Sequence, residues 1–297
     1  MIDFRQLTLL AADNQIECLE ELLILAEAQA VTFSDNDGKT PIFEPPVGTH
    51  PIWPQTIVQA LFYDTRSDNE ILADLATCFQ RVNLLIELPE SLMVINDQDW
   101  VRTTLDQFKP MEIGKFWVEP SWCKGDTPAG LTLLKLDPGL AFGTGMHPTT
   151  QLCLEWLSDH PTKCQSVIDF GCGSGILGIG AGCMGASLIT GLDIDPQALI
   201  ATEQNASLNK LAIETRTADE LPSQTFDLVI ANILANPLIQ LARDLTHLMK
   251  PNGVIVLAGL LDEQALEVRS AYPSIRFNAD MSKDGWTLLS GTQILQR

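Results

Sequence analysis

The feature that most constrains the fold is a regular alternation of strand and helix patterns in the second part of the chain. Short apolar segments typical of buried strands, such as 167–170, recur between stretches such as 196–209, in which apolar residues have helical spacing. This alternation predicts a mostly parallel sheet covered by helices on both faces. Two late strand patterns, 276–278 and 287–290, are separated by a Lys-Asp-Gly turn signal and predict an antiparallel hairpin at one edge.

The first part of the chain has a different pattern of predicted elements, in which the order strand, helix, strand occurs twice. Strands are predicted at 4–10, 31–34, 57–62 and 84–88, and helices at 16–28 and around 69–79. This pattern predicts a small α+β domain over 1–95, of the split βαβ kind. A charged segment, 96–114, is predicted to connect it to a second domain over 115–297.

The charge of the chain limits its partners. The sequence has 297 residues and a formal net charge of −20, and residues 1–120 carry 7 basic and 20 acidic side chains. A nucleic-acid binder needs basic surface to replace the counterions around phosphates, so direct nucleic-acid binding is not expected. The acidity fits a basic partner, although solubility alone would also account for it.

Cysteine usage and hydropathy indicate the compartment. The seven cysteines form no C-x-x-C pair, so neither a common zinc module nor a disulfide framework is predicted, and no metal site is expected. The longest apolar run, 254–261, is too short to cross a bilayer. No targeting segment is evident at the start of the sequence. We therefore expect a soluble cytoplasmic protein that has no contact with membranes.

The sharpest motif is Asp-Phe-Gly-Cys-Gly-Ser-Gly, which follows the buried strand pattern 167–170. Gly171 and Gly173 let the backbone approach a ligand closely and expose amide N–H groups at the start of a helix. A dinucleotide fingerprint would need glycine at position 176, where the chain has Ile176. The acidic residue in front of the turn, Asp169, instead suits a cationic or amine-bearing ligand.

Polar residues at the ends of the following strand patterns extend this candidate site. Asp193 ends the next strand, where a carboxylate can accept hydrogen bonds from both ribose hydroxyls of a nucleoside. Asp195, before Pro196, is predicted to be a helix N-cap. Asp219 is placed to receive the exocyclic amine of adenine, or is an ordinary loop acid. Asn232 ends the fourth strand and offers a carbonyl to an amine, or is a turn residue.

A glycine-rich loop precedes the next helix pattern, in the sequence Leu-Asp-Pro-Gly-Leu-Ala-Phe-Gly-Thr-Gly-Met-His-Pro-Thr-Thr over 136–150. Phe142 lies in a Phe-Gly-Thr-Gly stretch that would close over a nucleoside site. Thr149 and Thr150 are candidate caps of the helix. His147 is either a general base or a packing or capping residue, and we favour the second interpretation. Asn236 is predicted to cap the helix that opens at Pro237.

These motifs together resemble the ribosomal protein methyltransferase A (PrmA) family. The resemblance rests on 137–150, 167–175, 191–196 and 232–238, and extends over essentially the whole chain. It implies a Rossmann-like methyltransferase domain, with a mostly parallel seven-stranded sheet and an antiparallel edge hairpin. It also implies a small ferredoxin-like N-terminal domain for substrate recognition. The chain departs from the family pattern at Thr104, where tryptophan is common, and at Met146, where threonine is usual.

The resemblance also implies a function. Family members use S-adenosylmethionine to methylate lysine side-chain amines and the N-terminal α-amine of the eleventh protein of the large ribosomal subunit, a basic ribosomal protein. By resemblance, the cofactor-contacting positions fall on Thr150, Gly171, Asp193 and Asn232. We expect Asn232 also to hold the amine or the methionine moiety during transfer, without a dedicated general base.

Other functions stay open at this point. The chain could methylate a small amine or another protein, since the catalytic half would look alike. A nicotinamide-linked dehydrogenase is disfavoured by Ile176. A catalytically silent ribosome-assembly binding protein is disfavoured by the intact Gly171, Asp193 and Asn232.

Overall fold

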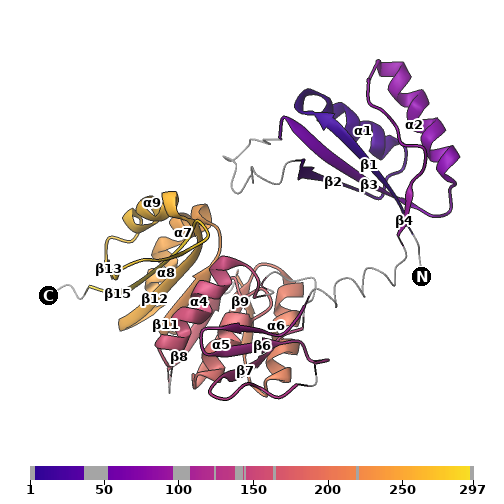
Figure 1. The fold of residues 1–297 in the computed structure, drawn as a ribbon. Coiled ribbons are helices and arrows are strands. Elements are labelled where there is room, and N and C mark those ends of the chain that lie inside the picture. Colours follow the sequence, from indigo (N-terminus) through magenta and orange to yellow (C-terminus); the bar gives the residue numbers. More distant parts are fainter. Residues whose placement is uncertain are drawn as a thin grey trace. The chain divides into compact units, whose positions relative to one another are not determined.

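The chain folds into two compact units. The computed structural model describes residues 4–36, 53–95, 108–123, 125–137, 143, 145–162, 165–218 and 221–294. The units comprise residues 1–107 and 108–297 (Figure 1). The second unit starts earlier than the predicted position 115. The reason is that β5 (Met111–Ile113), within the predicted connecting segment, pairs with β6 (Phe116–Glu119) of that unit.

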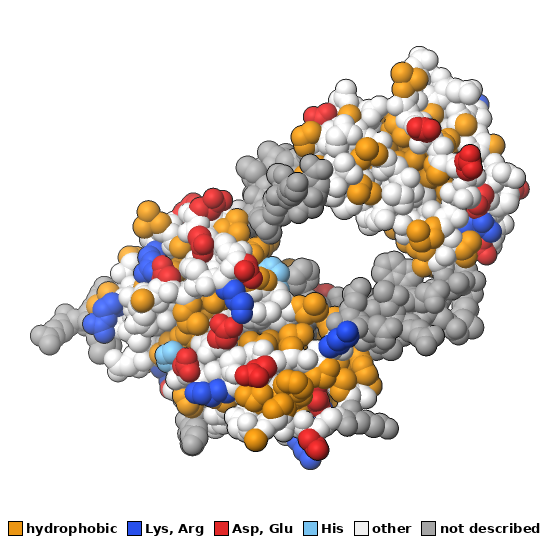
Figure 2. Space-filling model, in the orientation of Figure 1, with side chains coloured by type: hydrophobic (Ala, Val, Ile, Leu, Met, Phe, Trp, Pro, Cys, Tyr) orange, Lys and Arg blue, Asp and Glu red, His pale blue; other side chains and the backbone are white. Residues whose placement is uncertain are grey.

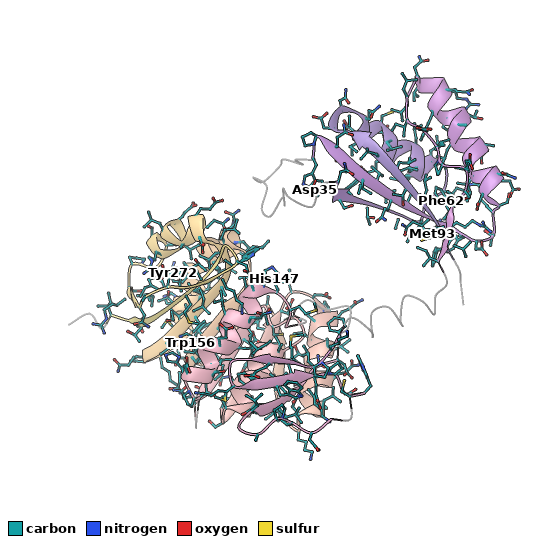
Figure 3. All side chains as sticks on the ribbon, in the orientation of Figure 1. Asp35, Phe62, Met93, His147, Trp156 and Tyr272 are labelled. Carbon is teal, nitrogen blue, oxygen red and sulfur yellow. The ribbon has the colours of Figure 1, made fainter. Side chains whose placement is uncertain are left out.

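The first unit is a four-stranded antiparallel sheet in the order β2-β3-β1-β4, with two helices packed on one face. Its elements are β1 (Phe4–Ala12), α1 (Ile16–Leu25), β2 (Ala30–Asp35), β3 (Gln55–Tyr63), α2 (Asp68–Val82) and β4 (Met93–Ile95). Because side chains alternate along a strand, residues such as Leu7 and Leu9 of β1 and Phe62 of β3 all lie in the core between the sheet and the helices. Figure 3 labels Phe62. α2 begins with a capping box formed by Ser67 and Glu70.

The predicted strand over 84–88 is wrong. Its apolar residues pack against the core without joining the sheet, and β4 is formed by Met93–Ile95 instead. An ion pair helps to explain why residues 93–95, and not 84–88, pair with β1. The Asp68 carboxylate binds the Arg5 guanidinium of β1 and accepts a hydrogen bond from the Leu92 N–H at 3.0 Å. Asp68 therefore holds Leu92 close to β1 immediately before β4 begins. Strand periodicity in the sequence does not reveal this contact.

The second unit contains an eight-stranded mixed sheet. The strand order is β10-β9-β8-β11-β12-β15-β13, and β14 pairs with β15 outside this path. The strands are β8 (Ser166–Phe170), β9 (Leu188–Asp193), β10 (Glu214–Thr217), β11 (Phe226–Asn232), β12 (Met249–Leu261), β13 (Ile275–Phe277), β14 (Met281–Lys283) and β15 (Trp286–Gln293). The first five in the path are parallel, while β13, β14 and β15 pair antiparallel.

Helices cover both faces of this sheet, as the alternation predicts. The helices are α4 (Pro148–Asp159), α5 (Ile176–Cys183), α6 (Pro196–Leu208), α7 (Ala235–Gln240), α8 (Ala242–His247) and α9 (Ala265–Ser270). One core joins the sheet to α4, α5 and a separate three-stranded sheet of β5, β6 and β7 (Thr132–Lys135), and the other joins it to α7, α8 and α9 (Figure 1). Trp156 belongs to the first core and Tyr272 to the second (Figure 3).

Two further expectations for the second unit need correction. The region 237–249, predicted as one helix, forms α7 and α8, which meet at Leu241. The hairpin at the sheet edge joins β14 to β15 around Asp284, whereas the predicted strand near 276–278 is β13, which pairs with the far end of β15. The sheet thus has one short strand more than the seven expected.

No helix in the described part of the chain is long and apolar enough to cross a membrane. Within the same residues, no group of three or more His, Cys, Asp or Glu side chains is arranged to hold a metal ion.

A close backbone approach joins β12 to the segment that follows β11. Gly259 has φ +90, and a Cβ atom there would lie 2.2 Å from the Ile233 carbonyl oxygen. Gly130 has a similar φ of +87, but a Cβ atom there would meet nothing within 4 Å. Both glycines have an unusual φ, but only Gly259 lies against another backbone segment. Substituting each one therefore distinguishes the energetic cost of the φ angle from the cost of a steric clash.

We predict that Gly259→Ala lowers the free energy of unfolding by several kcal/mol, because backbone atoms must move. Gly130→Ala is expected to cost only about 1–2 kcal/mol, the penalty of a left-handed conformation. Chemical denaturation of the two variants measures both values. Equal losses would show that the contact with Ile233 does not constrain the fold.

Candidate functional site

The candidate site is the edge of the large sheet at which β8, β9 and β11 end. β8 lies between the other two strands and pairs in parallel with both. Strand order reverses at β8, and open α/β sheets bind their ligands at such a switch point. The structure therefore brings together Gly171, Asp193 and Asn232, as the sequence predicted from strand ends alone.

The turn after β8 presents bare main chain at this edge. Gly171 has φ +73, and a Cβ atom there would lie 2.4 Å from the Ile233 side chain. The N–H groups of Gly171 and Cys172 both donate to the Leu192 carbonyl oxygen, at 2.7 and 3.0 Å. The Gly175 N–H donates to the Cys172 carbonyl oxygen at 2.8 Å. Residues 171–175, the glycine turn, are thus fixed in a shape that only glycine permits at position 171.

Asp193 fixes the same turn from β9. One carboxylate oxygen of Asp193 accepts a hydrogen bond from the Gly173 N–H at 2.9 Å, and the other accepts one from the Asp195 N–H at 3.0 Å. Each carboxylate oxygen has two lone pairs, so both keep acceptor capacity. The Asp195 side chain accepts from the Gln197 N–H at 2.9 Å, which confirms the predicted N-cap of α6.

Asp169, in front of the turn, is buried and serves a different contact. One of its carboxylate oxygens accepts a hydrogen bond from the Gly178 N–H of α5 at 2.8 Å. Burial raises the pKa of Asp169 to about 7, and the charge of Asp193 acts in the same direction, against the effect of the Gly178 hydrogen bond. The side chain therefore joins β8 to α5, and its predicted role towards a ligand is not tested by these contacts.

Asn232 is joined to the helix that follows the glycine-rich loop. Its amide Nδ2 donates to Thr150 Oγ1 at 3.4 Å, and Thr150 lies in the first turn of α4 and is buried. This long contact engages the NH₂ side of the amide. Thr150 and Asn232 are 82 positions apart, and both were predicted as site residues.

His147 caps α4, in agreement with the capping interpretation. Its side chain accepts a hydrogen bond from the Thr149 N–H, and its ring lies edge-on to Trp286 with 4.7 Å between centroids. Partial burial lowers the pKa of His147. The neutral form that caps the helix is thereby favoured.

The predicted cap at Asn236 is wrong. α7 begins at Ala235 with Leu234 as its N-cap, so Asn236 and Pro237 both lie in the first turn. A proline is tolerated there because the first N–H groups of a helix have no partner within it. Phe142 and Asp219, the remaining predicted site residues, lie outside the described residues.

The sequence did not reveal two residues that hold the glycine turn from the side of α6. Thr202 and Asn205 of α6 donate hydrogen bonds to the carbonyl oxygens of Gly173 and Ser174, at 3.1 and 3.0 Å. Ser174 Oγ donates to the Gly143 carbonyl oxygen at 2.6 Å. The available signal was polar residues at 202, 205 and 209, a spacing that places them on one helix face. Such a face is usually solvated, but here it is turned inwards.

Comparison with known proteins decides the family. A family model described as ribosomal protein L11 methyltransferase (PrmA) matches residues 3–293. The chain belongs to this family. It is 42% identical to a protein named ribosomal protein L11 methyltransferase from Hydrogenovibrio crunogenus, over 97% of each chain. It is 45% identical to one of the same name from Pseudomonas paraeruginosa, over 96% of this chain and 97% of the relative.

A solved structure supports the same conclusion. The crystal structure of ribosomal protein L11 methylase from Lactobacillus delbrueckii subsp. bulgaricus is 30% identical, with a TM-score of 0.57. The match covers 61% of this chain and 96% of that chain. Membership of the PrmA family, predicted from the motifs, is confirmed, and the second unit has an α/β methyltransferase-like fold with a mixed sheet.

The buried Asp169 gives the stability of this PrmA-family protein a predicted pH dependence. Its folded-state pKa of about 7 lies above the unfolded value of 3.8, so the folded chain retains a proton that the unfolded chain releases between these values. The free energy of unfolding contributed by this group therefore falls as pH rises through that window. Asp169→Asn is expected to remove this dependence and to stabilise the protein by about 1–3 kcal/mol at pH 8.

Asp227 provides the matched control. A hydrogen bond from the Lys250 ammonium, together with bonds from Ser166, lowers the pKa of Asp227 to about 2. Its contribution to stability is present at neutral pH and is lost on acidification through that pKa. Urea denaturation at several pH values should therefore show opposite signs for Asp169→Asn and Asp227→Asn at pH 8. Destabilisation by both would contradict the role of burial at Asp169.

Proposed function

We propose that this member of the PrmA family is an S-adenosylmethionine-dependent N-methyltransferase whose substrate is ribosomal protein L11. The observation that carries the proposal is the meeting of the glycine turn, the Asp193 carboxylate and the Asn232 amide at one edge of the sheet. Family membership and the names of the two relatives support the same activity.

The residues at this edge fit the cofactor. At Gly171 the turn presents main-chain atoms to the cofactor. A side chain at this position would collide with Ile233. Asp193 would accept hydrogen bonds from the ribose hydroxyls through the lone pairs that its two N–H partners leave open. When bound, S-adenosylmethionine supplies an electrophilic methyl group on a sulfonium. Phe142 beside the nucleoside, Asp219 at the adenine amine, Asp169 and Gly173 complete the proposed set.

Asn232 would orient the amine that receives the methyl group. Its Nδ2 donates to Thr150, and its Oδ1 would accept from an amine N–H or from the amino group of the methionine moiety. Methyl transfer is an in-line displacement, so orientation supplies much of the rate enhancement. The proposed targets are lysine side chains and the N-terminal α-amine of the substrate.

No dedicated general base is needed in this proposal. A lysine amine has a pKa of about 10.4, so fewer than about one in a thousand is neutral at pH 7. Entry into an apolar mouth lowers that pKa and increases the neutral fraction. His147 is occupied as the cap of α4, and Asp169 is buried against α5. Water would carry the proton away.

The first unit would recognise the substrate. Its topology, with strand order β2-β3-β1-β4 and helices after β1 and β3, supports a ferredoxin-like domain. Residues 1–95 carry four basic and fifteen acidic side chains, and acidic groups predominate on the face of this unit shown in Figure 2. Arg5 and Arg66 are already paired with carboxylates. The remaining negative charge would steer a basic ribosomal protein in the cytoplasm.

Intact-mass measurement tests the proposed activity. The protein is incubated with S-adenosylmethionine and purified ribosomal protein L11, and each methyl group transferred adds about 14 Da to L11. Cofactor binding without any mass increase on L11 would favour methylation of another substrate or a silent assembly role. Absence of cofactor binding in calorimetry would reject the assignment altogether.

We predict that Asn232→Ala lowers turnover about 10-fold or more, because the amine loses its orienting acceptor. Thr150→Val, which keeps the Asn232 amide but removes its anchor, is expected to cause a smaller loss. Steady-state rates with L11 as substrate measure both effects. Full activity of the Asn232→Ala variant would remove this residue from the mechanism.

The proposed steering predicts a strong dependence on salt. Raising ionic strength from about 0.05 to 0.5 M shortens the Debye length and weakens attraction between an acidic domain and a basic substrate. KM for L11 should therefore rise several-fold, while the affinity for S-adenosylmethionine changes little. An unchanged KM for L11 would remove electrostatic steering from the proposal.

A further inference from the structure

The inward face of α6 carries two polar side chains that have no role in the proposal so far, and the C-cap residue of the helix, Asn209, provides a third. Thr202 and Asn205 are almost fully buried, with 0% and 3% of their surface exposed, and Asn209 follows one turn later. Burying such groups is unfavourable unless they are hydrogen-bonded. All three find their partners in backbone groups of other segments.

Two of these side chains hold consecutive carbonyl groups of the glycine turn. Thr202 Oγ1 donates to the Gly173 oxygen at 3.1 Å, and Asn205 Nδ2 donates to the Ser174 oxygen at 3.0 Å. In a planar trans peptide, the C=O and the following N–H point in opposite directions. Because both carbonyls are held against α6, the N–H groups of Ser174 and Gly175 are turned away from it.

Asn205 also connects the turn to the start of the glycine-rich loop. Its Oδ1 accepts a hydrogen bond from the Asp137 N–H at 3.0 Å, so a single amide joins Asp137 to Ser174. Ser174 Oγ in turn donates to the Gly143 carbonyl oxygen at 2.6 Å. Asp137, through Asn205, and Gly143, directly, are thus both connected to Ser174 by hydrogen bonds.

We propose that Thr202 and Asn205 are positioning residues that set the peptide orientation of the glycine turn and thereby the affinity for the adenosyl cofactor. This inference rests on the proposed function. Neither side chain has to touch the cofactor. An apolar side chain could fill the same space, but it would leave the Gly173 and Ser174 carbonyls without these donors. The Ser174 N–H would then lose its fixed direction, while the Gly175 N–H keeps its bond to the Cys172 carbonyl oxygen.

Asn209, the C-cap residue of α6, provides a matched control. Its amide makes the same kind of two-way bridge, donating to the Lys135 oxygen at 2.7 Å and accepting from the Lys135 N–H at 2.8 Å. Lys135 ends β7 and is not part of the glycine turn. A variant at Asn209 therefore measures the loss of a similar bridge, together with the bond that Asn209 Nδ2 donates to the Asn205 carbonyl oxygen at 2.8 Å, while the bonds from Thr202 and Asn205 to the turn are kept.

The test measures the dissociation constant for S-adenosylhomocysteine by calorimetry and the melting temperature of each full-length variant. Asn205→Ala and Thr202→Val are expected to raise the dissociation constant at least 10-fold. Asn209→Ala should lower the melting temperature to a similar extent but change the dissociation constant less than 2-fold. Thr202→Ser, which keeps the hydroxyl donor, should bind nearly as tightly as the wild type. KM for L11, measured at saturating S-adenosylmethionine, should stay unchanged in all four variants.

The outcomes separate this inference from the proposed function. If the wild-type chain does not bind S-adenosylhomocysteine, both are overturned. If it binds, but Asn205→Ala and Asn209→Ala have equal dissociation constants, only the positioning role is overturned. Equal binding by Thr202→Val and Thr202→Ser would also overturn it. Should Asn205→Ala fail to fold, the Thr202 pair decides the question alone, because valine preserves the shape of threonine.

Discussion

Hydrogen bonds hold the glycine turn from two sides, and the rest of the candidate site depends on them. On one side, β9 contributes the Leu192 carbonyl and the Asp193 carboxylate, which accept from the turn's N–H groups. On the other side, Thr202 and Asn205 of α6 donate to its carbonyls. A turn rich in glycine has little side-chain packing of its own, so its neighbours must impose its shape.

Two carboxylates near this turn have separate tasks because their surroundings differ. Asp169 is buried beneath α5, and the low polarity around it raises its pKa to about 7. Asp193 is partly exposed at the end of β9 and already accepts two backbone N–H groups. The first joins a strand to a helix, whereas the second keeps acceptor capacity at the edge of the sheet. The Asp193 carboxylate places negative charge at this edge, which suits a cationic ligand.

The sequence predictions were correct where the structure depends on neighbouring residues and failed where it depends on contacts between distant ones. Glycines after a buried strand, an aspartate ahead of Pro196 and alternating strand and helix patterns are local signals, and the structure confirms the elements that they predict. The failures occurred where a distant contact intervened. The strand predicted at 84–88 is replaced by Met93–Ile95, because Asp68 pins Leu92 beside Arg5. Thr202 and Asn205 were missed because helical spacing does not tell whether a polar face meets water or backbone.

The sequence by itself determined the family, the order of elements, and the residues that end the strands at the sheet edge. Only the tertiary structure decided which groups meet there. Thr150 reaches Asn232 across 82 positions, and Asn205 connects Asp137 to Ser174. These contacts depend on β8 lying between β9 and β11 and on α6 turning its polar face inwards. The reason is physical: local propensity acts over a few residues, whereas a hydrogen bond between distant residues forms only when packing has brought its donor and acceptor within about 3 Å.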